Sequence, residues 1–531
     1  MKPPTNPLVR ALLTDMYQIT MVYGYWKAGK HNDDAVFDQF FRECPFGGEF
    51  AIFAGLGEAL KYVNSFGFSD DDIEYIRGEL PDCDPDFFKW LRQTNTDEIT
   101  IHAIHEGSVV FPRTPPMIIY GPLGIGQMLE TALLNLVNYP TLIATNAARF
   151  RLAAGPKKFL IDMGLRRAQG PDGALSGALY SYIGGFDATS NVLAGKLFGI
   201  PIKGTHAHSF VTSFASLDDI EHDEFVERVL FFREKIQKLF GLGKTNDGEL
   251  AAFIAYARAF PKGFLALVDT YNTLKSGVPN FLAVAFALAE KGLKPVGIRL
   301  DSGDLAHLSK ESRKMFITAI AEILIKNTLL LDGNDLLIAA SNDINEGAIH
   351  AMNQQGHEID TFGVGTHNIT CQAQPAMGGV YKLVEINGRP CIKISENQIK
   401  ILLPGKKTGH RLIGKDGRPI LDLLIADGEP EPRPGERILC CHPFDQHKRV
   451  YVTPSAVRHL HICYYRNGVP TEEANKSIAE IREHAQRELA SLREDHLRTT
   501  NPTPYKTALS ESLFNYLHKL WSAEAPIDEL S

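Results

Sequence analysis

Two histidines stand close together in the segment Gly204-Thr205-His206-Ala207-His208-Ser209, which follows a short apolar run. A neutral imidazole can act as a nucleophile or as a general acid or base, so a histidine at a strand end is a candidate catalytic group. Histidines that only satisfy hydrogen bonds in a loop would produce the same pattern. The segment by itself leaves both interpretations open.

A second candidate segment, Arg299-Leu300-Asp301-Ser302-Gly303-Asp304, also ends an apolar run. In a strand, side chains two positions apart point to the same side, so Arg299 and Asp301 face the same way. Burying them is costly unless they pair or bind a ligand. Asp301 and Asp304, with the serine between them, could hold ribose hydroxyls or Mg²⁺. A structural ion pair between Arg299 and Asp301 is the alternative.

Three further loops have the composition of a phosphate site. Arg166 and Arg167 lie in a glycine-rich stretch, and arginine binds phosphate through two parallel hydrogen bonds while glycines let backbone amides approach. Phe362-Gly363-Val364-Gly365-Thr366 offers amides and a hydroxyl, and Asp343 lies in a loop of small and polar residues. Solvated surface arginines and tight turns are the alternatives.

The elements that position these residues follow a regular pattern from about residue 146. Short apolar runs end in polar or glycine-rich tips and alternate with helical segments, which is typical of a parallel sheet. The runs are 158–162, 182–187, 200–205, 264–269, 295–301, 336–341 and 359–363, and the helical segments include 191–198, 223–240, 280–291 and 309–326. Seven such units predict an α/β barrel, complete or incomplete, with an open doubly wound sheet as the alternative. In either fold ligands bind at the carboxyl ends of the strands, where the candidate residues lie.

The remainder of the chain predicts two more regions. Residues 1–145 mix helices and strands, and the strand-rich residues 371–440, with a hairpin turn at Asn387-Gly388, would complete that discontinuous α/β domain. The barrel itself covers residues 146–370. Residues 441–531 are expected to form a mostly helical C-terminal extension.

Composition excludes several classes of protein. The formal net charge of -8 argues against a nucleic-acid binder, which needs a concentrated basic face. The apolar runs fall short of the roughly 20 residues of a membrane span. Seven cysteines, an odd number in a long chain, do not form a disulfide framework, and Cys440-Cys441-His442 with His447 fits no zinc spacing. We therefore expect a cytosolic protein that acts on small molecules.

Taken together, these motifs resemble nicotinate phosphoribosyltransferase over nearly the whole chain, in collinear order. The stretches that carry the resemblance are 12–21, 37–42, 45–48, 53–56, 165–173, 205–209, 299–304, 363–366, 381–385 and 442–444. The resemblance implies an irregular α/β barrel of the type II phosphoribosyltransferase kind with a discontinuous α/β N-terminal domain. It implies an enzyme that joins nicotinate to phosphoribosyl pyrophosphate while it hydrolyses ATP, with Mg²⁺ on the pyrophosphate, in NAD biosynthesis.

The resemblance also implies roles for single residues. His208 corresponds to a histidine that is transiently phosphorylated, and Asp301 to a catalytic carboxylate that holds ribose hydroxyls. Nicotinate would be contacted by Thr205, Arg299 and Tyr17, and Tyr17 would come from the other subunit of a homodimer. The residues expected to bind phosphoribosyl pyrophosphate are Thr366, Arg166, Arg167, Asp301, Asp343, Gly363 and Gly365. Mg²⁺ would lie near Asp301 and Asp304.

A related nicotinamide enzyme and a non-catalytic paralogue remain as alternatives. The nicotinamide enzyme uses an aspartate to bind the substrate amide, and Ser190 takes that place here. A carboxylate would repel nicotinate, whereas a hydroxyl can donate to it. Met163 stands where that enzyme has an aromatic residue against the substrate ring, and it offers a softer packing surface.

Overall fold

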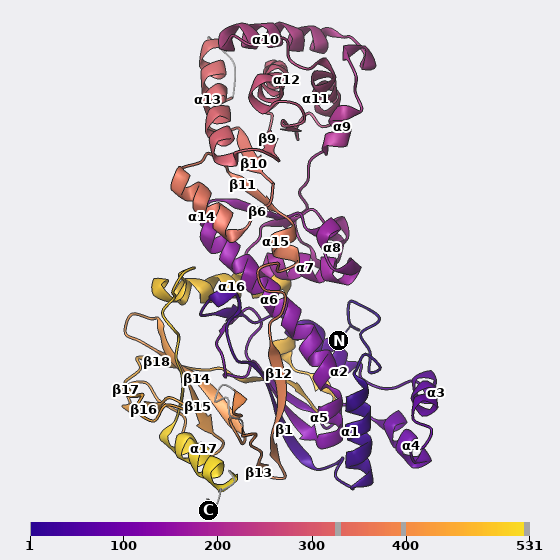
Figure 1. Ribbon diagram of the computed structural model, residues 1–531, viewed down its shortest axis with the longest axis vertical. Coiled ribbons are helices and arrows are strands. Elements are labelled where there is room, and N and C mark those ends of the chain that lie inside the picture. The colour runs from indigo at the N-terminus through magenta and orange to yellow at the C-terminus, as the bar shows by residue number, and fades with distance from the viewer. Residues whose placement is uncertain (1, 324–330, 395–399, 525–531) are drawn as a thin grey trace, which may run out of the picture. The chain divides into compact units, whose positions relative to one another are not determined.

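The computed structural model describes residues 2–323, 331–394 and 400–524. The chain divides into two compact units (Figure 1). The first unit combines Met1–Asn146 with Ala373–Ser531, and the second unit is Ala147–Gln372. The first unit is therefore built from both ends of the sequence, and the second is one continuous segment.

The second unit is built around a parallel sheet. Its strands are β6 (Phe159–Asp162), β7 (Ala188–Thr189), β8 (Leu265–Leu267), β9 (Gly297–Leu300), β10 (Leu337–Ala340) and β11 (Thr361–Val364). They are ordered β7-β6-β11-β10-β9-β8, and every neighbouring pair is parallel. This arrangement agrees with the predicted α/β class, because parallel neighbours need helical crossovers between them.

One short segment touches both edges of this sheet. Ile202 forms a parallel bridge with Thr189 of β7. At the other edge, the backbone N–H of Leu267 in β8 donates to Nε2 of His206, with 3.3 Å between the nitrogens. Four residues of extended chain span at most about 14 Å, so the edge strands β7 and β8 are drawn round toward each other. The result is an irregular barrel with a seam between β7 and β8, which is closed on the β8 side by the side chain of His206.

Five of the seven predicted strand runs contain a strand, and two predictions were wrong in detail. Residues 182–184 belong to the end of helix α7 (Gly170–Gly184), and the strand begins only at Ala188. This helix is buried along most of its length, so its apolar sequence could not be told from a buried strand by periodicity. The run 200–205 contains only the bridge at Ile202.

Helices surround this sheet, and their starts follow from the sequence. The helices are α8 (Val192–Phe198), α9 (His208–Thr212), α10 (Glu224–Phe240), α11 (Asp247–Ala259), α12 (Val278–Glu290), α13 (Leu305–Ile323), α14 (Glu346–Gln355) and α15 (Thr366–Ile369). Asp223 and Asn246 cap α10 and α11 by accepting backbone N–H groups, as short polar side chains do at helix starts. The predicted helix 309–326 coincides with α13 as far as residue 323, and its last residues lie outside the described ones.

Helix α12 is the centre of the core of this unit. It is apolar on all sides and packs against α10, α11 and α13 (Figure 1). All of its residues except Glu290 are buried. A helix that is apolar all round must be enclosed, so the remaining helices and the sheet are organised about it.

The first unit contains two large sheets, one entirely antiparallel and one mixed. One is ordered β13-β12-β1-β5-β3-β19-β20, with β1 (Asp34–Phe41), β3 (Thr100–Ala103), β5 (Met117–Pro122), β12 (Gly379–Ile386), β13 (Arg389–Pro390), β19 (Ile462–Arg466) and β20 (Val469–Pro470). The antiparallel pairing of β12 with β1 joins the two parts of the sequence. The hairpin turn at Asn387-Gly388 is confirmed, with both residues at positive φ, 49° and 73°.

The second sheet adds strands to the segment that was expected to form a mostly helical C-terminal extension. It is ordered β17-β16-β21-β15-β14-β18, with β14 (Lys407–Ile413), β15 (Pro419–Ala426), β16 (Ile438–Cys441), β17 (Arg449–Val452), β18 (Ala456–His459) and β21 (Thr507–Leu509). Residues 441–524 thus supply strands to both sheets and form only two α-helices, α16 (Ile478–Ser491) and α17 (Glu511–Glu524). These strands are two to five residues long, too short to show a clear alternation in the sequence.

The other helices of the first unit lie before the second unit in the sequence. They are α1 (Met16–Lys27), α2 (Leu56–Asn64), α3 (Asp70–Glu79), α4 (Pro85–Gln93), α5 (Leu123–Met128) and the start of α6 (Glu130–Ala154), and β2 (Ala51–Ile52) with β4 (Val109–Val110) forms a small ladder. Among the described residues, no helix combines the length and the apolar character that crossing a lipid bilayer requires.

Candidate active site

A cleft of about 510 Å³ opens at the carboxyl ends of the barrel strands in the second unit. Its size is in the range of small-molecule binding sites. The predicted site residues that line it are Met163, Arg166, Arg167, Ser190, Thr205, His208, Arg299, Asp301, Asp343, Gly363, Gly365 and Thr366. Loops that are up to two hundred residues apart in the sequence therefore meet at one place.

Arg299 lies on β9 and is only partly neutralised by protein groups. Its side chain is 12% exposed, and Nη2 lies 3.9 Å from Oδ2 of Asp301, which is too long for a close ion pair. Nη1 donates to Oγ1 of Thr205, while Nε has no hydrogen-bond partner among the described residues. Burial lowers the pKa of this guanidinium, and the carboxylates of Asp301 and Asp269 oppose that shift. A buried cation with unused donors is suited to bind an anionic group.

His208 begins α9 and lies between two carboxylates. Its Nδ1 is 3.1 Å from Oγ1 of Thr270. Its Nε2 is 3.7 Å from Oδ2 of Asp301 and 3.9 Å from Oδ1 of Asp269. The imidazole of His208 is 42% exposed, so the ring remains accessible from the cleft. The carboxylate of Asp269 is 2% exposed, so this contact orients the ring from its buried side.

His206 has a structural role instead of the catalytic role that is open to His208. It is buried among aromatic rings, with the ring of Tyr256 at a centroid distance of 4.8 Å. Burial lowers the pKa of His206 to about 4, so the ring is neutral at pH 7 and its Nε2 accepts from Leu267. His206 is thus a structural group of the barrel seam.

The carboxyl end of β6 shapes the loop that carries Arg166 and Arg167. Asp162 is buried and accepts hydrogen bonds from Thr189 Oγ1 at 2.8 Å and from the backbone N–H of Gly164 at 2.9 Å. The loop then forms a single 3-10 turn, Leu165–Arg167, on which both arginine side chains are exposed. Two exposed cations at the rim can meet a phosphate without burial of an unpaired charge.

The opposite wall is formed by the loops after β10 and β11. Ser341 Oγ donates to Oδ1 of Asp301 at 2.6 Å, which fixes that carboxylate. Asp343 adopts a positive φ of 44° at the tip of its loop. A Cβ atom on Gly363 would lie 2.6 Å from the sulfur of Met163, so a larger residue here would displace the Met163 side chain.

Two predicted residues lie elsewhere. Asp304 is not among the residues that line the cleft; its Oδ1 accepts the backbone N–H of His307 at 3.0 Å in the first turn of α13. Tyr17 belongs to α1 in the first unit, where it is 46% exposed.

Four polar side chains, those of Asp269, Thr270, Ser302 and Ser341, contact the predicted residues or one another. The sequence indicated a role for Ser302 but none for the other three. Asp269 and Thr270 follow β8 and contact His208, Ser302 Oγ donates to Oδ2 of Asp269, and Ser341 holds Asp301. Asp269 ends the predicted strand run 264–269, and this position places it on the same rim as the other candidates.

Comparison with known proteins identifies the family. Residues 12–138 match the nicotinate phosphoribosyltransferase N-terminal domain, residues 159–413 the nicotinate phosphoribosyltransferase family, and residues 406–517 the C-terminal domain. Nicotinate phosphoribosyltransferase 1 of Arabidopsis thaliana is 50% identical over 544 residues, which cover 99% of this chain and 96% of that protein.

Two solved structures extend the comparison to the fold. The crystal structure of human nicotinic acid phosphoribosyltransferase superposes with a TM-score of 0.84 at 43% identity, covering 96% of this chain and 99% of that chain. Nicotinate-nucleotide pyrophosphorylase from Pyrococcus furiosus shares the fold, with a TM-score of 0.59 at 19% identity over 91% of this chain and 95% of that chain. The fold is that of the type II phosphoribosyltransferases, and the chain belongs to the nicotinate phosphoribosyltransferase family.

Proposed function

We propose that this protein joins nicotinate to phosphoribosyl pyrophosphate in NAD biosynthesis, releasing nicotinate mononucleotide and pyrophosphate with hydrolysis of ATP. The observation that carries the proposal is the convergence of Arg299, Asp301 and His208 on one cleft at the carboxyl ends of the barrel strands. These residues supply a cation for the nicotinate carboxylate, an acceptor for ribose hydroxyls and a nucleophile for phosphate. The names of the full-length relatives support the same reaction.

The nicotinate end of the cleft would be formed by Arg299 and Thr205. The unpaired Nε of Arg299 and the hydroxyl that its Nη1 contacts lie on the same wall. Ser190 and Met163 line the cleft as well. A serine hydroxyl can donate to a carboxylate, which favours nicotinate over nicotinamide as substrate.

The phosphoribosyl end would be formed by Asp301 and the surrounding loops. Asp301 would accept from ribose hydroxyls while Ser341 holds its other oxygen. Arg166, Arg167, Thr366 and the backbone of Gly363 and Gly365 would surround the phosphates, with Asp343 at the rim. When bound, Mg²⁺ would neutralise the leaving pyrophosphate. Of the two carboxylates expected near it, Asp301 and Asp304, Asp301 is the one that lines the cleft. Asp304 is the weaker candidate because it is engaged with α13.

The transfer itself would depend on positioning rather than on covalent chemistry. The pyridine nitrogen forms its bond to C1 of ribose as the bond from C1 to the pyrophosphate oxygen breaks. Positive charge develops on the ribose, and the carboxylate of Asp301 is placed to stabilise it.

ATP would be coupled through His208. A bond forms between the imidazole nitrogen and the γ-phosphorus as the bond to the bridging oxygen of ADP breaks, and water later hydrolyses the phosphohistidine. Phosphorylation adds about -2 of charge beside Asp269 and Asp301. That charge would rearrange Arg299 and the loop arginines, and so change the affinity of the cleft for its substrates.

The protein is further proposed to act as a cytosolic homodimer in which Tyr17 reaches the active site of the other subunit. All seven cysteines are free, as in a reducing compartment. The half-exposed side chain of Tyr17 is available for such a contact.

The proposed function is tested with the purified chain, phosphoribosyl pyrophosphate, Mg²⁺ and equal concentrations of nicotinate and nicotinamide, with and without ATP. We expect nicotinate mononucleotide as the main product and a faster rate with ATP. Nicotinamide mononucleotide as the main product would reassign the substrate, and tight binding without turnover would identify a non-catalytic paralogue.

A further inference from the structure

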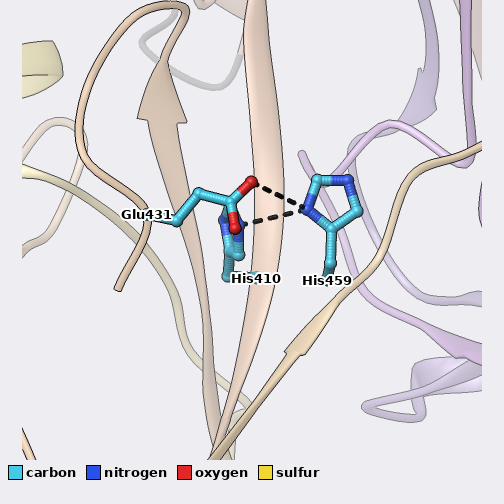
Figure 2. Close-up of side chains that lie close together, drawn as sticks. All are labelled: His410, Glu431 and His459. Atoms are coloured by element: carbon cyan, nitrogen blue, oxygen red, sulfur yellow. Dashed lines mark hydrogen bonds and ion pairs between the residues drawn. The ribbon is translucent and has the colours of Figure 1, made fainter. Parts of the chain in front are cut away.

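Outside the cleft, three side chains of metal-binding type converge in the first unit. They are His410 on β14, His459 on β18, and Glu431 in the loop between β15 and β16 (Figure 2). Nδ1 of His459 lies 3.2 Å from Nε2 of His410 and 3.8 Å from Oε1 of Glu431. We propose that this cluster binds a divalent transition-metal ion, with Zn²⁺ as the representative.

The register of the sheet places the two imidazoles together. Strands β14 and β18 are antiparallel neighbours, and His410 is directly opposite His459. Side chains at directly opposite positions lie on the same face, with their Cβ atoms about 4.5–5.5 Å apart. Backbone hydrogen bonds between the two strands thus hold the imidazoles close together. Binding of an ion therefore requires little further ordering of these side chains.

The distances between the ligand atoms suit a tetrahedral ion. With Zn–N bonds of about 2.0–2.1 Å, neighbouring ligand atoms lie about 3.3–3.4 Å apart. The observed 3.2 Å and 3.8 Å differ from this by a few tenths of an ångström. The side chain of Glu431 is 71% exposed and that of His459 is 39% exposed, so both can adjust and water can reach the fourth position.

The donor set selects the class of ion. Two imidazole nitrogens and one carboxylate oxygen suit Zn²⁺, Cu²⁺ or Ni²⁺, whereas Mg²⁺ prefers oxygen ligands. The site is therefore chemically distinct from the Mg²⁺ that accompanies pyrophosphate.

His410 is prepared to act as a ligand. It is 1% exposed, and it lies directly opposite His459 in the sheet. Its Nδ1 is buried without a hydrogen-bond partner among the described residues. Its Nε2 is the ring atom that faces the cluster, 3.2 Å from Nδ1 of His459 (Figure 2).

The neighbouring groups are already engaged elsewhere. Arg458 donates to both carboxylate oxygens of Glu488, so its charge is compensated. His461 accepts from the backbone N–H of Gly409 and contacts the carbonyl of Pro115 through Nε2, which leaves neither ring nitrogen free. The candidate ligands are thus the three residues of the cluster.

A bound ion would fasten the loop that carries Glu431 to the edge of the sheet, because β18 is an edge strand. Without an ion, the same geometry is a hydrogen bond between two imidazoles with a surface glutamate beside it. These two states differ in zinc binding and in the effect of zinc on thermal stability.

The test uses the full-length protein stripped with a chelator and titrated calorimetrically with Zn²⁺, and separately with Co²⁺ as a visible-spectroscopic probe. The variants are His459→Ala and Glu431→Gln, with His447→Ala as the control for removal of an exposed histidine of the same unit. Loss of an outer hydrogen-bond partner already costs about 10–100-fold in metal affinity. We therefore expect His459→Ala to weaken Zn²⁺ binding by at least about a hundredfold and Glu431→Gln by about tenfold.

In the wild type and the control, we expect one Zn²⁺ at this affinity, the absorption bands of tetrahedral Co²⁺, and a rise in the melting temperature with Zn²⁺ that His459→Ala lacks. Both variants leave the cleft of the second unit intact, so these losses would assign the ion to the cluster. Zn²⁺ binding that is absent in the wild type, or unchanged in His459→Ala, would overturn the proposal and leave a histidine–histidine hydrogen bond.

Discussion

His206 and His208 are separated by one residue, yet burial gives them different chemistry. His208 is accessible and lies between Asp269 and Asp301, whereas His206 is enclosed by aromatic rings and neutral. A nucleophile must reach its substrate, so of these two histidines His208 is the one that fits the proposed phosphorylation by ATP.

Replacing His208 by alanine is therefore expected to abolish ATP hydrolysis and ATP stimulation while a slow ATP-independent transfer persists. The reason is that Arg299, Asp301 and the phosphate loops remain in place. The measurement is the rate of nicotinate mononucleotide formation with and without ATP, together with mass spectrometry of the ATP-treated protein under alkaline conditions. Unchanged ATP stimulation in the variant would contradict the assignment.

Arg299→Lys keeps the charge but removes the planar pair of donors. A hydrogen bond to a charged group contributes about 1.5–3 kcal/mol, so kcat/KM for nicotinate should fall about 10–100-fold, with a much smaller change in KM for phosphoribosyl pyrophosphate. Steady-state kinetics with each substrate varied in turn decide this. An equal loss for both substrates would show that Arg299 supports the cleft as a whole instead of binding nicotinate.

Ser190→Asp should reverse the preference between the two pyridine substrates. A carboxylate here would face the nicotinate carboxylate, and like charges at close range cost several kcal/mol. We expect kcat/KM for nicotinate to fall at least about a hundredfold while nicotinamide is retained or improved, as measured by competition. Ser190→Asn is the neutral control, and an equal loss in both variants would argue against the electrostatic explanation.

At the scale of elements, the seam between β7 and β8 is closed by the segment that contains Ile202 and His206. The burial of His206 in this seam makes the stability of the barrel depend on pH. The pKa of His206 is lowered to about 4 in the folded protein from an ordinary value of about 6.5. The unfolded chain therefore takes up a proton that the folded chain does not, so stability from this residue is full above about pH 6.5 and declines as the pH falls toward 4.

His206→Gln tests this dependence, because glutamine keeps an acceptor for the Leu267 N–H but cannot titrate. Between pH 6.5 and 4, the unfolding free energy of the variant should fall less steeply than that of the wild type, because its unfolding takes up as much as one proton fewer. At pH 7.5 the two unfolding free energies should be nearly equal. Denaturant unfolding at a series of pH values provides the comparison. Parallel curves for the two proteins would show that His206 titrates normally.

At the scale of the whole molecule, the proposed dimer predicts complementation between inactive variants. If Tyr17 acts in the active site of the other subunit, a mixed dimer of Tyr17→Ala and His208→Ala contains one site with both residues intact. Refolding the variants together should then restore ATP-stimulated activity that neither shows alone. No recovery, despite formation of mixed dimers, would mean that Tyr17 acts within its own chain or not at all.

The sequence by itself determined the parallel α/β class and the strand tips that carry the site. The strands β6, β8, β9, β10 and β11 are short buried runs between helices, and this local pattern predicts a parallel sheet. Because all parallel strands end on one rim, Arg299, Asp301, Asp343 and Thr366 could be expected to meet there. Their collinear match to a known family added the individual roles.

Only the tertiary structure decided how the side chains at that rim are used. Asp269 and Thr270 contact His208 about sixty residues away, because loop side chains respond to neighbours that local periodicity does not encode. Asp304, by contrast, makes a local contact with His307 at the start of α13. The same holds for the short strands β19 and β21, whose partners β3 and β15 are distant in the sequence. The pair His410 and His459 likewise exists only through the register of β14 with β18, since 49 residues separate them along the chain.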